Sequence, residues 1–251
     1  MNELFKNDIT LNQENHKYIL KENPDFEFTS VTEFIHKFFK KFDKDKIAKK
    51  QLKNNPKYFG KTIEDVFEDW NKGSQRGNIV HNELEDYINE KIKQPTHYMS
   101  KIGAAWIDYK KSKGNKFDSE VIVYSKQLQI AGTIDVLLYN EKQDLYHIVD
   151  WKTNKRINET AFNKQKGIKD STKHLPDCNY IHYSLQLSFY KRILESYYGI
   201  DVGSLTIIHF KEDAKNQMNS KKFLQNVHYK IYSITDMSSD IDSMLREMDL
   251  V

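Results

Sequence analysis

The spacing of hydrophobic residues changes several times along the 251-residue chain, and each change predicts a new kind of element. Near the N-terminus, apolar and polar residues alternate in DITLNQENHKYIL around the turn-like NQEN, which predicts a β-hairpin. A helical spacing begins after Ser30 in SVTEFIHKFF, where Ser30 and Glu33 have the spacing of a capping box. The chain is therefore expected to begin with a hairpin that is followed by helices.

Three further helices are expected before the pattern changes again. The first is DKDKIAKKQLKN, which is rich in lysine, and the third is KIGAAWIDYKKSK. The second begins after Thr62, with Asp65 at the capping-box spacing, and its helical pattern continues for about thirty residues. Gly73 and Gly77 lie within it and predict a break there.

Strand-like alternation returns in KFDSEVIVYS, LQIAGTIDVLLYN and LYHIVDWKT, with a hairpin turn at NEKQ. After a polar stretch at 153–177 the pattern predicts a helix over 179–198, the strands SLTIIHFKE and NVHYKIYSI, and a short acidic helix at the C-terminus. This order predicts an α/β or α+β fold with one central mixed sheet flanked by helices. We expect residues 1–60, the hairpin and basic helices, to pack on a core formed by residues 61–251.

Composition narrows the class of protein. Charged residues make up 30% of the chain and hydrophobic residues 38%, which is typical of a soluble globular protein. No run is long and apolar enough for a membrane helix, and the first residues lack the apolar core of a signal peptide, so we expect no membrane partner. We expect an intracellular, reducing location, cytoplasmic or nucleoid-associated, and the Lys, Asn and Ile content also fits an AT-rich viral or phage genome.

Cysteine and lysine usage refine this expectation. The single cysteine, Cys178, excludes an internal disulfide and any zinc or iron–sulfur site that needs several thiolates from this chain. Residues 36–58 hold nine lysines against Asp43 and Asp45, an excess that favours a polyanionic partner. The alternative is a solvated, lysine-rich helix face with no partner.

Two charged residues in the strand IVDWKT are the first candidates for chemistry. Asp150 and Lys152 share one face of the strand, whereas Val149 and Trp151 face the other way, so Trp151 is expected in the core. On the preceding strand, Asp135 is expected opposite the face of Ile134, Val136 and Leu138, and the hairpin can bring it beside Asp150. Paired carboxylates repel one another unless a cation lies between them, and their hard oxygens suit Mg²⁺ or Mn²⁺.

Other polar residues could complete this site. Glu120 lies on the strand upstream, and His81 and Glu85 lie four residues apart on one helix face, as do Gln186 and Tyr190 on a later helix. Lys152 could orient a water molecule or stabilise charge on a phosphate. Taken alone, each has an ordinary structural alternative: an edge charge, a hydrogen-bonded core histidine, a surface helix charge or simple packing.

The order of these motifs resembles the PD-(D/E)XK nuclease superfamily, and within it the RecB-like exonuclease branch that includes the mitochondrial genome-maintenance exonucleases. The motifs are GNIVHNELE, GTIDVL, IVDWKT and QLSFY, and they span about residues 74–195. The resemblance implies a four- or five-stranded mixed sheet and metal-dependent cleavage of DNA. It also implies roles for the site residues: metal ligands (His81, Asp135, Asp150), the catalytic lysine (Lys152), an acid on the first core helix (Glu85) and a pair near the substrate (Gln186, Tyr190).

The chain departs from the family pattern in two places. Ile134 stands where the superfamily's name has proline, and the one cysteine cannot hold the iron–sulfur cluster that some relatives carry. We therefore expect one or two Mg²⁺ or Mn²⁺ ions, with Glu120 as a further ligand, and no iron–sulfur cluster. The resemblance does not cover residues 1–60.

The predicted function is that of a metal-dependent DNA exonuclease acting on ends or single strands in replication, recombination or repair. Residues 153–177 hold six Lys or Arg residues against three acids, and we expect them to form a mobile lid or arch in which Lys155 and Arg156 bind DNA. A disordered surface loop is the alternative for this segment. The alternatives for the whole chain are a structure-specific or nicking endonuclease of the same superfamily and a non-catalytic DNA-binding recombination factor.

Overall fold

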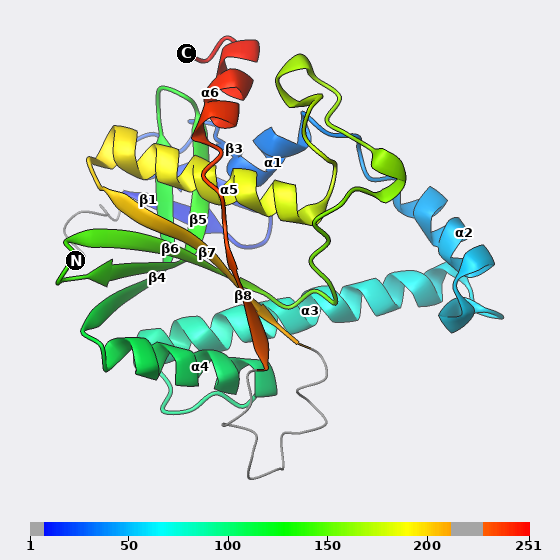
Figure 1. The fold of residues 1–251 in the computed structure, drawn as a ribbon, viewed down its shortest axis with the longest axis horizontal. Coiled ribbons are helices and arrows are strands. Elements are labelled where there is room, and N and C mark those ends of the chain that lie inside the picture. The colour runs from blue at the N-terminus through cyan, green and yellow to red at the C-terminus, as the bar shows by residue number, and fades with distance from the viewer. Residues whose placement is uncertain (1–7, 212–227) are drawn as a thin grey trace.

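The computed structural model describes residues 8–211 and 228–251, and its centre is a six-stranded mixed β-sheet (Figure 1). The strands of this sheet are β3 (Thr29–Ser30), β4 (Asn115–Ser125), β5 (Ile130–Asn140), β6 (Leu145–Lys152), β7 (Val202–Phe210) and β8 (Tyr229–Ser233). Strands β4, β5 and β6 form an antiparallel meander, β7 is parallel to β6, and β8 is antiparallel to β7. Strand β3 pairs in parallel with the first residues of β5. The central mixed sheet expected from the sequence is confirmed, with six strands where the family resemblance implied four or five.

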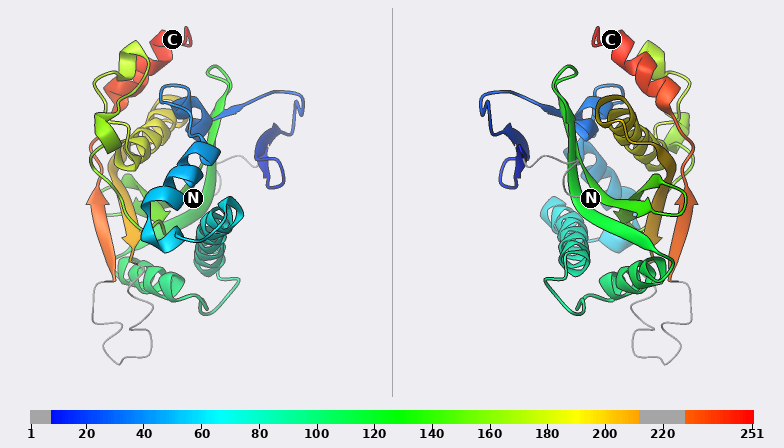
Figure 2. Two further views of the ribbon diagram at one scale, coloured as in Figure 1. Left: turned by 90° about the vertical axis from the view of Figure 1, so that its right-hand side faces the viewer. Right: turned by 90° about the vertical axis from the view of Figure 1, so that its left-hand side faces the viewer.

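Helices cover both faces of this sheet, as the end-on views show (Figure 2). The helices are α1 (Val31–His36), α2 (Lys44–Asn54), α3 (Ile63–Ile88), α4 (Tyr98–Lys111), α5 (Asn179–Ile193) and α6 (Ser238–Glu247), with short helical turns at Pro56–Tyr58, Phe162–Lys164, Asp170–Thr172 and Leu194–Tyr198. Ser30 caps α1 by accepting a hydrogen bond from the Glu33 amide, and Thr62 with Asp65 forms the complete capping box of α3. None of the described helices is long and apolar enough to cross a membrane.

The sheet separates two hydrophobic cores because side chains alternate along its strands. Helices α1, α5 and α6 cover one core, which includes Ile148 of β6, and helices α3 and α4 cover the other, which includes Val149 and Trp151. Alternation along β6 therefore follows the pattern that the sequence predicted. Trp151 is 2% exposed and lies between Trp106, in an edge-on contact, and Phe210, in a stacked contact. Its predicted place in the core is confirmed.

Truncating this central aromatic residue should cost much of the stability of the fold. Trp151→Ala is expected to lower the free energy of unfolding by about 3–5 kcal/mol, because the cavity it leaves cannot be filled by rigid neighbours. Urea denaturation at equilibrium measures this loss. Trp70→Ala, at a half-buried position on α3, is the matched control and should cost clearly less. An equal loss in both variants would contradict the assignment of Trp151 to the second core.

The expectation that Ile134, Val136 and Leu138 share one face of β5 is wrong. Ile134 lies in the first core, whereas Val136 and Leu138 lie in the second. The pairing of β4 with β5 is interrupted at this point, between Ser119↔Val136 and Val121↔Ile134. Glu120 lies in the interruption with φ +49°, in the left-handed region that residues other than glycine rarely adopt. Simple alternation therefore fails at this position.

Helix α3 runs without a break through both of its glycines, so the expected break near Gly73 and Gly77 is wrong. Gly77 lies where the helix meets the end of β6, because a Cβ at this position would lie 3.3 Å from Oγ1 of Thr153. Arg76 fixes the same crossing, since its guanidinium donates a hydrogen bond of 2.9 Å to the carbonyl of Thr153. The next turn of the helix carries His81 towards the sheet.

The predicted N-terminal hairpin is confirmed as β1 (Ile9–Asn12) and β2 (Lys17–Leu20), a separate two-stranded sheet. It stands beside the β4–β5 ribbon rather than extending the central sheet (Figure 2). The hydroxyls of Tyr18 and Thr133 are 3.0 Å apart, and the Tyr124 hydroxyl donates to Asp8. These contacts fix the hairpin over one end of β5. The boundary between the hairpin with its basic helices and the core, placed at residue 60, stays a prediction.

The segment after β6 forms an arch on the side of the molecule that also carries α2 (Figure 1). Its second half is held against the rest of the protein, because the Ile168 amide donates to the Phe38 carbonyl and the Ser171 amide donates to Glu247. Thr172 is fully buried and Leu175 nearly so. A free, disordered loop does not describe this half. Movement of residues 153–177 as a lid stays a prediction.

Candidate active site

A cleft of about 1030 Å³ opens between α3, the N-terminal hairpin and the ends of the central strands. The α3 helix supplies one wall through the face that includes Gly77, His81 and Glu85. The hairpin supplies the opposite wall through Ile9, Thr10, Leu11, Gln13 and His16. Glu120, Thr133 and Lys152 lie along the sheet between them. Most residues that the sequence marked for chemistry therefore lie in or beside one cleft.

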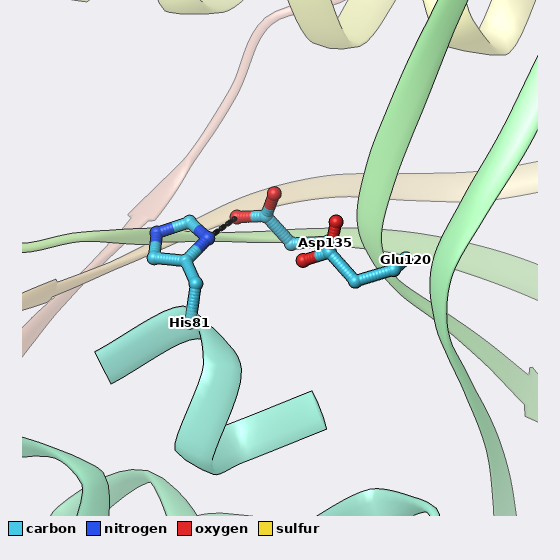
Figure 3. A group of neighbouring side chains, drawn as sticks. All are labelled: His81, Glu120 and Asp135. Atoms are coloured by element: carbon cyan, nitrogen blue, oxygen red, sulfur yellow. Dashed lines mark ion pairs between the residues drawn. The ribbon is translucent and has the colours of Figure 1, made fainter. Parts of the chain in front are cut away.

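Three of these residues, from α3, β4 and β5, converge on one another (Figure 3). His81 reaches from α3 towards the sheet, and Glu120 and Asp135 reach towards it from β4 and β5. Each offers one ligand atom, and the three atoms lie within 4.8 Å of one another. His81 Nδ1 is 3.5 Å from Oδ2 of Asp135, and His81 Nε2 is 3.1 Å from the Trp151 carbonyl oxygen. The imidazole is thus held in place from both of its nitrogens.

Asp150 and Lys152 form a second, adjoining group on β6. Lys152 Nζ lies 2.5 Å from Oδ2 of Asp150, and the Asp150 side chain is only 4% exposed. This contact is an ion pair without good hydrogen-bond direction, because the buried Oδ2 has no hydrogen-bond partner among the described residues. The two groups are linked, since the Trp151 amide donates a 2.8 Å hydrogen bond to Oδ2 of Asp135. Asp150 is beside the three-residue group but outside it.

Burial and neighbouring carboxyl groups raise the pKa values of Glu120 and Asp150. Burial raises the pKa of Glu120 to about 8, helped by the charges of Asp135, Glu85 and Asp150. Burial also raises the pKa of Asp150 to about 6, and the opposing charge of Lys152 limits that rise. Burial alone would lower the pKa of Lys152, but Asp150 and Asp135 outweigh it, so the pKa rises and the amine stays protonated. The carboxyl groups of Glu120, Asp135 and Asp150 thus lie close together with the Lys152 ammonium beside them, and their ionisation gives the site an excess of negative charge.

Comparison with protein families accounts for this arrangement. The family model of the PD-(D/E)XK nuclease superfamily matches residues 15–249, nearly the whole chain. The chain belongs to the PD-(D/E)XK nuclease superfamily. The match includes the second strand of the hairpin and the basic helices, so it extends well beyond the residues 74–195 over which the sequence motifs show the resemblance. A search of curated proteins found no matching relative.

Nucleases of the PD-(D/E)XK superfamily use divalent metal ions, and the side chains in the cleft fit such an ion. One imidazole nitrogen and two carboxylate oxygens are the donors that Mn²⁺ accepts, and carboxylate oxygens suit Mg²⁺. Asp150, whose Oδ2 lies 2.5 Å from the Lys152 ammonium, adds a further carboxylate beside this group. Glu120 supports this account, because its φ of +49° costs on the order of 1–3 kcal/mol and such strain concentrates at functional sites.

The remaining predicted site residues lie at different distances from this centre. Glu85 lines the cleft one helical turn after His81, and its carboxylate is 3.8 Å from Lys91. Gln186 donates a 2.9 Å hydrogen bond to the Tyr190 hydroxyl, as their spacing predicted. Tyr190 is 4% exposed, and its hydroxyl helps to orient Gln186. The catalytic and binding roles of these residues stay predictions.

Lys155 and Arg156 lie just outside the cleft, on the first residues of the arch. Both side chains are exposed. Hydrogen bonds from Lys57 and Tyr58 lower the pKa of Asp69, and the nearby charge of Lys155 adds to this effect. The Arg156 carbonyl accepts a hydrogen bond from Asn179, which ties this part of the arch to the start of α5. The two cations therefore extend the basic surface of α2 towards Lys152.

Three features of the site do not follow from the sequence motifs. Tyr183 lines the cleft and its ring centroid is 4.5 Å from Lys152 Nζ, but its only indication in the sequence is its place one helical turn before Gln186. Arg76 fixes the crossing of α3 with β6, but nothing in the sequence distinguishes it from an ordinary charged residue on the surface of a helix. The hairpin wall was predicted as a hairpin, but its place beside the cleft depends on packing between distant segments.

Proposed function

We propose that this PD-(D/E)XK nuclease is a DNA exonuclease of the RecB-like branch that uses Mg²⁺ or Mn²⁺ and acts on DNA ends or single strands. The observation that carries the proposal is the convergence of His81, Glu120 and Asp135 beside the Asp150–Lys152 pair. Clustered carboxylates are costly in a protein interior without a cation, and a structural core has no use for them. Replication, recombination and repair are the processes in which such an enzyme would act.

The division of work among the residues follows from their positions. His81, Glu120 and Asp135 would hold the ion, with Asp150 as a further ligand. A divalent ion in such a site polarises the phosphate and lowers the pKa of bound water. Lys152 keeps its proton, so it can donate hydrogen bonds to the attacking water or to a phosphate oxygen, and Asp150 fixes its position.

The surroundings of the cleft support DNA as the substrate. Exposed lysines of α2 and the cations Lys155 and Arg156 surround its approach on one side, and the phosphate backbone is the natural partner of such a surface. The cleft itself is walled by the hairpin, α3 and the sheet. A cleft with three walls admits a single strand or a strand end more readily than the middle of a duplex, which favours exonuclease action.

Digestion of end-labelled DNA tests this proposal. With Mn²⁺ or Mg²⁺, the protein is expected to release labelled nucleotides from linear single-stranded DNA and to leave a closed single-stranded circle of the same sequence intact. Linearising the circle should restore cleavage, because it creates the ends that the enzyme needs. Cutting of the closed circle at the linear rate would instead show an endonuclease, and no cleavage of any form would refute the nuclease assignment.

A further inference from the structure

A second cavity, of about 470 Å³, lies between α1, the start of α5 and the arch. Its lining includes Ile35 of α1, Asn158 and Phe162 of the arch, and Tyr183 and Gln186 of α5. The volume is within the range of pockets that hold small organic groups, about 300–1,000 Å³. No described part of the chain fills this cavity.

Tyr183 forms a wall shared by this cavity and the metal cleft. Lys152 Nζ lies on the cleft side, 4.5 Å from the centroid of the Tyr183 ring. A group in the second cavity would therefore be separated by one aromatic side chain from a phosphate bound at Lys152. The two spaces are suitably placed for neighbouring parts of one ligand.

The side chains that line the second cavity suit contact with a base. The lining contains no lysine or arginine; its two histidines are His36 and His182, and its one acid, Asp177, is paired with His182 at 2.9 Å. The neutral polar groups include the side-chain amides of Asn158 and Gln186. The side-chain amide nitrogen of Gln186 donates a hydrogen bond to the Tyr190 hydroxyl. This bond fixes the orientation of the Gln186 amide and leaves its oxygen on the side away from Tyr190. Amides can form hydrogen bonds with the edge of a nucleobase, and aromatic rings can stack on its face.

The rim of the cavity continues towards the basic helix. The Phe162 side chain is 62% exposed, and Lys50 Nζ of α2 lies 4.1 Å from the centroid of its ring. An exposed aromatic ring beside a cation is the arrangement with which single-strand binding proteins stack a base and contact the next phosphate. Lys152, Tyr183, Phe162 and Lys50 therefore follow one another from the metal cleft, across the second cavity, to the basic helix.

We propose that this cavity receives the unpaired base of a nucleotide next to the scissile phosphate, with the ring of Phe162 stacking on a base at the rim and Lys50 contacting the backbone. The identity of the ligand as DNA rests on the proposed function. A base that is paired in a duplex cannot enter the cavity, so the site selects single strands and frayed ends. This explains how the enzyme would distinguish an end from the interior of a duplex.

Binding measurements in metal-free buffer test this site without cleavage. Phe162→Ala is expected to weaken binding of a single-stranded oligonucleotide by about 5- to 150-fold, the range that loss of one stacked base gives, and to change duplex binding little. Tyr109→Ala is the matched control, because Tyr109 of α4 is 58% exposed and also has a lysine over its ring, Lys113 at 5.5 Å. Unchanged single-strand binding by Phe162→Ala, or an equal loss on duplex, would overturn the proposal.

Filling the cavity gives an independent test. Thr32 lines the cavity from α1 with an exposed side chain, so Thr32→Trp should occupy part of the space with little effect on folding. A strand carrying 2-aminopurine should lose the fluorescence change that base insertion produces, whereas Glu33→Trp, at the next exposed position on α1 and outside the cavity lining, should keep it. Loss of the change in both variants, or in neither, would refute the base pocket.

These tests are separate from the test of nuclease activity. A parent protein that cleaves DNA while neither cavity variant alters single-strand binding would refute the pocket and keep the proposed function. A parent protein that cleaves no DNA, but whose single-strand binding falls with Phe162→Ala and Thr32→Trp, would refute the proposed function and support the pocket.

Discussion

Replacing Lys152 with alanine is expected to slow cleavage of single-stranded DNA by about 10²- to 10⁴-fold under single-turnover conditions. The half-buried ammonium of Lys152 lies 2.5 Å from Asp150 and lines the cleft, so it is placed to orient water or to neutralise charge that develops on the phosphate. Binding of the same DNA should change much less than the rate, because the loss concerns charge that appears in the transition state. Quenched-flow measurement with saturating enzyme separates the two effects.

Lys191→Ala is the matched control for this variant. Lys191 is also a half-buried lysine in an ion pair, 2.6 Å from Glu195, but it lies on α5 away from both cavities. It should cleave DNA at the parental rate. Circular dichroism should confirm that Lys152→Ala is folded, since the substitution leaves Asp150 without its counter-ion. A folded Lys152→Ala protein that cleaves as fast as Lys191→Ala would contradict the catalytic role of Lys152.

Removing Asp135 should abolish the response of the protein to metal ions. We expect Mn²⁺ to bind the folded state, and a concentration one hundred times the dissociation constant should then stabilise the parent protein by about 2.7 kcal/mol. Asp135→Asn is expected to lose most of this stabilisation, because Asp135 lies between His81 and Glu120 in the ligand group. Thermal unfolding with and without Mn²⁺ measures the difference, and this measurement does not depend on DNA cleavage.

Without Mn²⁺, Asp135→Asn should lower the free energy of unfolding by at most the contribution of one hydrogen bond to the Trp151 amide. The substitution also removes repulsion between carboxylates, which offsets part of that loss. The control is Asp242→Asn, which removes an ion pair with Arg192 on the opposite helical layer. That variant should keep the full Mn²⁺ stabilisation. Equal Mn²⁺ stabilisation of the parent and Asp135→Asn proteins would place the metal elsewhere.

Local patterns were sufficient to predict most of the fold. The capping residues Ser30 and Thr62 start the helices that the sequence indicated, and the meander β4–β5–β6 follows from three alternating segments joined by short turns. The glycines of α3 misled the prediction, because the helix gains from a close crossing at Gly77 that only the tertiary structure reveals. The six-strand count depended on β3, two residues that pair with β5 across a hundred positions of sequence.

The site was predictable where chemistry and strand alternation agreed. His81 and Asp135, which the motifs indicated, meet with Glu120, the further acid expected from the upstream strand, and the Asp150–Lys152 pair lies beside them. Alternation failed at Glu120 because a positive φ interrupts the strand pairing, and no pattern of residue types marks that backbone conformation. The contributions of Tyr183 and of the hairpin wall depend on contacts between distant segments, so they became visible only in the structure.

The location of Asp150 changes how the centre is understood. The sequence placed it on equal terms with Asp135, but the structure pairs it with Lys152 and leaves its Oδ2 buried without a directed hydrogen bond. Asp150 therefore connects Lys152 to the ligand group. Replacing Asp150 is expected both to weaken metal binding and to release Lys152 from its position. None of the sequence motifs includes the exposed lysines of α2 or Phe162, whose ring has Lys50 above it.

The central claim, that this cleft hydrolyses DNA with a divalent ion, is tested most directly by release of labelled nucleotides from linear single-stranded DNA with Mn²⁺ and with a chelator. The parent protein should release nucleotides in Mn²⁺ and none in the chelator, and Asp150→Ala should release almost none in either. Equal release by the parent and Asp150→Ala proteins, or release that persists in the chelator, would contradict the account.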